Sequence, residues 1–243
     1  MINYLKLQFS YLFSKIFTLI FLFVLILILV GVVFSANLDL GYAYLDGFRT
    51  RYFHEFLQQS FLIIEVILTV FLIFISSILC SKTNEALIVY SVEDYYQRLK
   101  FLFSRVLVSA GLNLVLIFCS FSFVVIIGSY FTPFIINSYD IFLILTAISF
   151  KIWFFQVLVI VLQAIANHFL ITLLPVLLFW FHKTINNYDD IENAVSEMVI
   201  KFVPSFTVEI NEIVFYESFY KYLIIAIIGI LIAILINQFK DYS

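Results

Sequence analysis

Apolar residues form long runs in this chain, and polar residues gather in short stretches between them. A helix needs about 20 mostly apolar residues to cross the hydrocarbon core of a bilayer. On this criterion the pattern predicts membrane-spanning helices at residues 16–34, 61–80, 106–128 and 219–237.

The stretch 141–182 is too long for one span and barely long enough for two. Its only polar break is "QAIANH", Gln163 to His168, and a tight turn is expected there. The turn gives spans at 141–162 and 168–182, the second containing Pro175, and brings the total to six. A single span over 141–182 is the alternative.

Composition sets the fold class. Hydrophobic residues make up 64% of the 243 positions and charged residues 12%, which is more apolar surface than one soluble core could bury. Six glycines and three prolines leave little room for flexible linkers. We therefore expect an all-α integral membrane protein with one transmembrane domain over residues 1–243.

Lysine and arginine predict the orientation, because positively charged loops stay cytoplasmic. With six spans, the side that carries both termini and residues 81–105 has seven basic and four acidic residues. The opposite side has five basic and eleven acidic residues. Both termini and residues 81–105 are therefore predicted to be cytoplasmic, and the acidic segment 183–218 external.

The first residues, "MINYLKLQFSYLFSKIF", predict an amphipathic helix on the cytoplasmic leaflet, with Lys6 and Lys15 available to lipid phosphates. Its apolar positions recur at helical spacing: Ile2, Leu5, Phe9, Leu12, Phe13 and Ile16. The alternative is that this segment prolongs the first span.

External residues 183–218 alternate acidic and apolar clusters and are broken by Pro204. This pattern predicts short helices in the outer leaflet, which would serve as a gate or as a plain anchor.

Residues 81–105 carry seven charges between two apolar runs. From Glu85 onward the apolar positions fall near helical spacing, while Glu93, Asp94 and Arg98 occupy other faces. A short cytoplasmic amphipathic helix of this kind can dock into a groove on a soluble partner. An ordinary solvated loop is the alternative.

Two charges fall inside predicted spans, where a buried ion is costly and often functional. Glu65 lies near the external end of the second span, and Lys151 nearer the middle of the fourth. They could pair, or Lys151 could extend toward the interface. A polar point in a translocation path is the functional hypothesis, and a structural salt bridge is the alternative.

Known enzyme motifs are absent from the sequence. There is no HExxH zinc helix, no GxSxG elbow and no GxxxxGK[ST] phosphate loop. "EDYYQR", Glu93 to Arg98, approximates the acidic motif of CAAX-type intramembrane proteases, but His54, His168 and His182 follow no matching spacing. We expect no catalytic, cofactor-binding or metal site in this chain.

The order of these elements resembles the permease subunit of type-2 ABC exporters. The likeness covers nearly the whole chain as architecture. In that family the segment after the second span carries a Glu and a Gly-Thr-x-Glu-like run, and a basic residue opens the third span. Glu85, Tyr90 to Val92 and Ser104-Arg105 can be laid on that pattern, although the glycine is missing, and "NQFKDYS" resembles the family's tails.

The resemblance implies a dimer of permease subunits, identical or not, in a bacterial plasma membrane. Each subunit would dock a separate ATPase, which binds the ATP and Mg²⁺, through residues 85–98. The residues expected at that contact are Glu85, Tyr90, Glu93, Asp94 and Arg98.

The resemblance implies outward transport, and the many phenylalanines in the spans favour hydrophobic or amphipathic cargo, above all small peptides or toxins. Phenylalanines in the spans could line the path, although core packing or lipid contact is the simpler interpretation: Phe71, Phe74, Phe101, Phe103, Phe118, Phe121, Phe123, Phe154 and Phe155. The competing function is that of an ATPase-independent carrier or a structural membrane protein.

Overall fold

The computed structural model describes residues 2–43, 49–81, 84, 95–131, 138–166, 168–186 and 212–239. Over these ranges the secondary structure is helical and contains no strand, as the sequence predicts. The elements in chain order are α1 (Ile2–Ser14), α2 (Ile16–Ala43), α3 (Arg49–Leu79), α5 (Tyr95–Phe131), α6 (Ser138–Ala166), the 3₁₀ helix η1 (Phe169–Thr172), α7 (Leu173–Asn186) and α9 (Glu212–Phe239).

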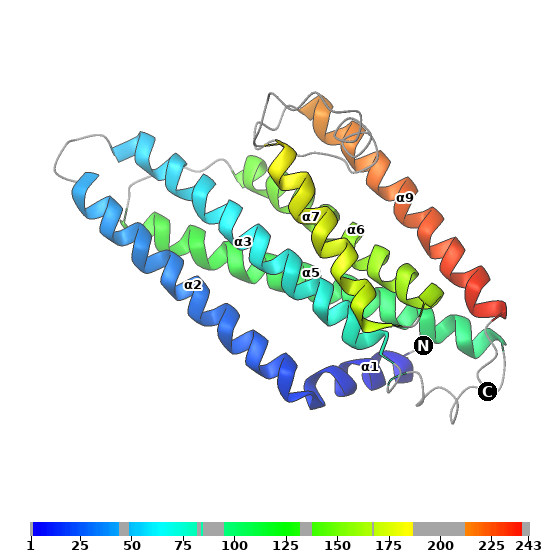
Figure 1. The fold of residues 1–243 in the computed structure, drawn as a ribbon. Coiled ribbons are helices and arrows are strands. Elements are labelled where there is room, and N and C mark those ends of the chain that lie inside the picture. Colours follow the sequence, from blue (N-terminus) through cyan, green and yellow to red (C-terminus); the bar gives the residue numbers. More distant parts are fainter. Residues whose placement is uncertain are drawn as a thin grey trace.

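The long helices form an up-and-down bundle. Helices α2, α5 and α7 run in one direction and α3, α6 and α9 in the other, and the start of α1 lies at the same end of the bundle as the end of α9 (Figure 1). Each predicted span lies within or almost within one helix of the bundle, with the fifth formed by η1 and α7 together, but over the described residues helix length and composition identify two or three spans and not six.

Length and apolar composition indicate a membrane protein. Among the described residues, Tyr96–Ile126 and Ile148–Ala166 are long and apolar enough to cross a bilayer. A third span results if α1 and Thr18–Gly31, which are bent by 72° at their junction, are taken together. Shorter apolar stretches lie at Ile63–Leu79, Leu170–Phe181 and Leu223–Ile236.

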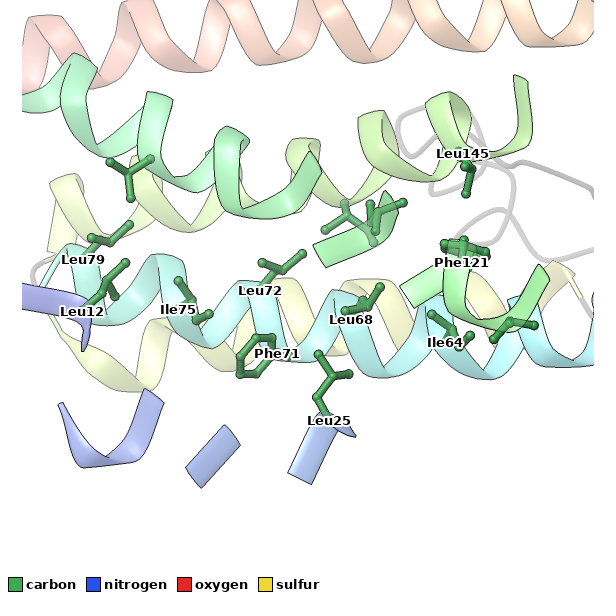
Figure 2. Packing of buried hydrophobic residues seen from close by; sticks show 14 residues of the cluster. Leu12, Leu25, Ile64, Leu68, Phe71, Leu72, Ile75, Leu79, Phe121 and Leu145 are labelled. Carbon is green, nitrogen blue, oxygen red and sulfur yellow. The ribbon is translucent and has the colours of Figure 1, made fainter. Parts of the chain in front are cut away.

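The main core lies between α3 and its neighbours. Helix α3 presents one stripe of fully buried side chains at helical spacing, from Ile64 and Leu68 to Leu79. This stripe packs against Leu12 of α1, Leu25 of α2 and buried residues of α5 and α6 (Figure 2). The stripe explains why α3 lies inside the bundle, although its sequence is no more apolar than that of α2.

Helix α6 is the second central element, because it contacts α3, α5, α7 and α9. Phe155 on α6 packs edge-on against Phe179 on α7, with ring centroids 5.6 Å apart. Against its other side, α9 presents the small residues Ala226, Gly229 and Ala233. Small residues allow two helix backbones to approach closely in a membrane.

The N-terminal segment is a helix separate from the first predicted span. Helix α1 ends at Ser14, Lys15 lies between the two helices with its N–H donating to the carbonyl of Leu12, and the two helices meet at 72°. Its predicted apolar stripe divides between two sides of the helix. Leu12 is fully buried in the core, whereas Phe9 and Phe13 are exposed. Helix α1 therefore has one side for the bundle and another side facing outward.

Two predicted boundaries are wrong. The turn placed at Gln163 to His168 begins later, because α6 continues through Ala166 and η1 follows, with the His168 side chain accepting a hydrogen bond from the backbone N–H of Leu170. The predicted cytoplasmic helix ends inside α5, which already begins at Tyr95.

Pro175 lies in the first turn of α7, where its missing N–H costs no helical hydrogen bond. The predicted external helices at 187–211 lie outside the described residues.

Candidate functional site

Most of the predicted ATPase contact lies outside the residues that the structure describes. Glu85, Tyr90, Glu93 and Asp94 belong to this group. Arg98 is half-buried in the first turn of α5. Helix α5 runs unbroken from Tyr95 to Phe131, so Arg98 lies on the same helix as the apolar stretch that follows it.

Helix α1 contacts the chain on both sides of residues 85–94. Before that segment, Asn84 donates from Nδ2 to Oε1 of Gln8 over 2.8 Å, and the hydroxyls of Tyr11 and Ser81 lie 2.7 Å apart. After it, the ring of Tyr4 meets that of Phe101 edge-on, with centroids 6.1 Å apart. The two ends of the predicted contact segment are therefore held by one short helix.

The contact between Gln8 and Asn84 is buried, and the contact between Tyr11 and Ser81 is partly buried. Gln8 and Asn84 are both fully buried, and Asn84 also donates to the carbonyl of Leu79 at the end of α3. Sequence reasoning did not single out Gln8. The available signal was its position between Tyr4 and Leu12, one turn from each, on the side of α1 that faces the bundle.

Arg105 lies further along α5, three turns from Tyr95. Its guanidinium carbon is 4.7 Å from the ring centroid of Phe101, and the residue is 4% exposed. Arginine stacked on an aromatic ring is a favourable cation–π arrangement. Phe101 therefore contacts both Arg105 of its own helix and Tyr4 of α1.

The two charges that fall inside predicted spans form an ion pair. Nζ of Lys151 lies 2.6 Å from Oε1 of Glu65, and the side chains are 8% and 11% exposed. The ammonium also lies 5.8 Å from the ring of Phe179. Of the two predicted arrangements, pairing is therefore the one observed. A buried pair of this kind leaves a costly charge if one partner is lost.

A second polar contact joins the same two helices. Nε2 of Gln163 donates to Oγ of Ser77 over 2.6 Å, and both residues are buried. This contact and the ion pair lie twelve residues apart on α3 and on α6 alike, which is ~18 Å along each helix. Helices α3 and α6 are thus parallel and joined in register at two levels. Gln163, predicted in a turn, is instead an interhelical contact.

Buried amides join α5 to α6 in a reciprocal manner. Asn113 of α5 donates to the carbonyl of Ser149 over 2.8 Å, and Gln156 of α6 donates to the carbonyl of Ser109 over 3.3 Å. Within the described ranges, Oδ1 of Asn113 and Oε1 of Gln156 have no hydrogen-bond partner. Buried carbonyl oxygens without partners can accept from water or from a polar ligand. The interface between α5 and α6 therefore contains a buried polar seam, separate from the ion pair between α3 and α6.

The phenylalanines that could line a path have different surroundings. Phe71, Phe101, Phe121, Phe154 and Phe155 are buried in the cores between helices. Phe103, Phe118 and Phe123 are each more than one third exposed on the outside of α5. Both groups fit the simpler interpretation, core packing and contact with lipid.

Metal-binding side chains do not gather anywhere in the described part of the chain: no three His, Cys, Asp or Glu residues lie together there in a way that could hold an ion. Comparison of the whole chain with protein-family models, curated proteins and solved structures finds no match.

Proposed function

We propose that this chain is the membrane-spanning permease subunit of a type-2 ABC exporter in a bacterial plasma membrane. Two permease subunits would form the translocation path, and a separate ATPase would dock on residues 85–98 of each. The cargo would be hydrophobic or amphipathic, with small peptides or toxins the preferred class. The membrane subunit needs no catalytic residue, because ATP hydrolysis resides in its partner.

The proposal of six spans rests on helix length alone, with η1 counted together with α7. The 14 residues of α7 and the four of η1 together extend ~29 Å, close to the ~30 Å of a hydrocarbon core. Helices α2, α3, α5, α6 and α9 have 28 to 37 residues and are longer than this. Six spans would place both termini and residues 81–105 on the same, cytoplasmic side.

One observation carries the proposal: α1 holds both ends of the segment on which the ATPase would dock. Asn84 and Ser81 are bonded to Gln8 and Tyr11, and Phe101 packs on Tyr4. A segment that only needed to be solvated would gain nothing from two buried anchors. A segment that receives force from a partner needs both ends fixed to the helices it moves.

The bundle also offers a route for that force. Displacement of residues 81–95 acts first on the end of α3 and the start of α5. Because α3 and α6 are joined at Ser77–Gln163 and Glu65–Lys151, α3 cannot slide along its axis without taking α6 with it. Nucleotide-driven closure of two ATPases would then move α3, α5 and α6 together, which is a rigid-body mode of switching.

Reconstitution tests the proposal. The full chain is purified with the P-loop ATPase encoded by a neighbouring gene and placed in lipid vesicles. We expect a stable complex and an ATPase rate that rises when the membrane subunit is present. If the membrane subunit binds no such ATPase and changes no hydrolysis rate, the exporter proposal fails.

A carrier that works without an ATPase is the second candidate, and the Glu65–Lys151 pair favours it. Buried ionisable residues inside a bundle of membrane helices are a feature that ion-coupled carriers use. A transport assay with the purified chain alone separates the two candidates. A carrier would transport its cargo when a proton or sodium gradient is applied, without any ATPase. An exporter would transport nothing until its ATPase and ATP are added.

A further inference from the structure

An apolar groove lies between α2 and α3. Its volume is about 240 Å³, and apolar side chains alone line it, among them Phe21, Leu25 and Ile28 of α2 and Val66, Val70 and Phe71 of α3. A water molecule occupies only ~30 Å³ in the liquid and needs two or more polar partners. The groove is therefore much larger than one water and offers none of the contacts that would hold water.

A cation lies on the N-terminal side of this groove along α2, six residues before the lining residue Phe21. Lys15 occupies the bend between α1 and α2 and is partly exposed, with its Nζ 4.7 Å from the ring centroid of Tyr11. The hydroxyl of Tyr11 in turn contacts Ser81, just after the end of α3. Lys15 is therefore at the junction of α1, α2 and α3. Two of these helices, α2 and α3, form the groove.

The groove begins within one leaflet of Lys15 and continues past the middle of the bilayer. On α2 its lining runs from six to 13 residues beyond Lys15, from Phe21 to Ile28, which is ~9 to ~20 Å at 1.5 Å per residue. Half of a ~30 Å hydrocarbon core is ~15 Å. An acyl chain whose headgroup lies at Lys15 would therefore enter the groove with its outer half.

Charge at the bend favours an anionic headgroup. Helix α1 contains no acidic residue, and Lys15 directly follows its last residue, whereas Lys6 lies nine residues earlier, about two and a half turns away. Each basic residue near an anionic membrane surface contributes ~1 kcal/mol to binding. A phosphate with a net negative charge is therefore preferred over a neutral zwitterionic headgroup at this position.

We propose that the junction of α1, α2 and α3 is a binding site for one anionic phospholipid. Lys15 contacts the phosphate, and one acyl chain enters the groove between α2 and α3. This site requires only that α2 and α3 lie in the membrane, so it holds for an exporter and for a carrier alike. It would fix the angle between α1 and α2 and thereby steady Tyr11 and Gln8 at the end of the predicted contact segment.

Photolabelling tests the site. The full-length protein is placed in phosphatidylcholine nanodiscs that contain phosphatidylglycerol with a diazirine in the middle of one acyl chain. We expect the label to concentrate on residues 21–28 and 66–71. Lys15→Gln should lower labelling of these residues about fivefold, the factor that corresponds to ~1 kcal/mol. Val24→Trp, which fills the groove, should lower it at least as much.

Matched controls separate a site from general lipid contact. Lys6→Gln removes the other cation of α1, and Leu27→Trp enlarges an exposed residue of α2 that does not line the groove. Both should keep the wild-type labelling. The proposal is overturned if phosphatidylcholine carrying the same diazirine labels the groove equally. It is also overturned if Lys6→Gln and Lys15→Gln act alike, or if residues 21–28 and 66–71 stay unlabelled in the wild type because a second copy of the chain covers them.

Discussion

Glu65 and Lys151 form an ion pair inside the bundle, and the 86 positions that separate them also separate Ser77 from Gln163. Two polar contacts with one sequence offset fix α3 and α6 as parallel helices in a single register. A slip by one residue would break both contacts at once. Unlike apolar side chains, which tolerate small sliding, this arrangement permits few intermediate positions between the two helices.

Removing one charge of the pair should destabilise the protein more than removing both. Lys151→Met leaves the buried carboxylate of Glu65 without its partner, and we expect a loss of ~3–5 kcal/mol in the free energy of unfolding. The double variant Glu65→Leu with Lys151→Met should lie within ~1 kcal/mol of the wild type. Unfolding in detergent, followed by circular dichroism, measures both.

Lys100→Met is the control for this comparison, because Lys100 is exposed on α5 and should cost little. If Lys151→Met is as mild as Lys100→Met, the buried pair does not contribute as described. The double variant also tests the path hypothesis. Full transport with both charges removed would make the pair structural only.

The contact between Ser77 and Gln163 should contribute less than the ion pair. A hydrogen bond between buried side chains of membrane helices contributes ~0.6 kcal/mol on average, with a maximum of ~1.7. A double-mutant cycle with Ser77→Ala and Gln163→Leu isolates this coupling energy. We expect it to be favourable and within that range. A coupling energy of zero would mean that the register is set by apolar packing alone.

Hydropathy alone was enough to predict the helices. The runs 16–34, 61–80 and 106–128 lie within or almost within single helices, because an apolar run of that length has no other way to satisfy its backbone. The separate N-terminal helix was also predictable, since Lys15 and the polar positions before it interrupt the run.

The neighbours of each polar residue were not predictable. Gln163 is a polar residue in an apolar stretch, and such a residue can lie in a turn or form an interhelical contact. Its partner, Ser77, decides between the two, and Ser77 lies on another helix. For the same reason the pairing of Glu65 with Lys151 stayed open. Periodicity also shows that α1 has an apolar stripe, but not that Leu12 packs into the core while Phe9 remains exposed.

Gly229 should tolerate a larger side chain less well than Gly111. A Cβ atom at Gly229 would lie 3.3 Å from Cγ2 of Val161 and 3.5 Å from Cγ1 of Val157, whereas one at Gly111 meets nothing within 4 Å. Gly229→Leu should therefore lower the free energy of unfolding by ~1–3 kcal/mol through overpacking of α9 against α6. Gly111→Leu, measured in the same thermal unfolding assay, should be neutral. Equal effects of the two substitutions would argue against close packing of α9 on α6.

The anchors on α1 should matter for coupling between ATP hydrolysis and transport. Gln8→Leu removes the acceptor for Asn84, so the start of the contact segment loses one of its two attachments to α1. We expect the number of cargo molecules exported per ATP hydrolysed to fall about fivefold, the factor that corresponds to a lost hydrogen bond of ~1 kcal/mol. Asn3→Leu is the control, because Asn3 lies on the exposed side of the same helix.

Charge reversal in the contact segment distinguishes docking from anchoring. Glu93→Lys, Asp94→Lys and Arg98→Glu together should weaken ATPase binding itself, since opposite charges across an interface become like charges. Gln8→Leu should leave ATPase binding intact and lower only the export per ATP, because it changes the attachment of the segment and not its surface. The two readouts are a pull-down of the ATPase and the ratio of export to hydrolysis in vesicles. If Gln8→Leu weakens the pull-down as strongly as the charge reversal does, α1 belongs to the docking surface and is not merely its support.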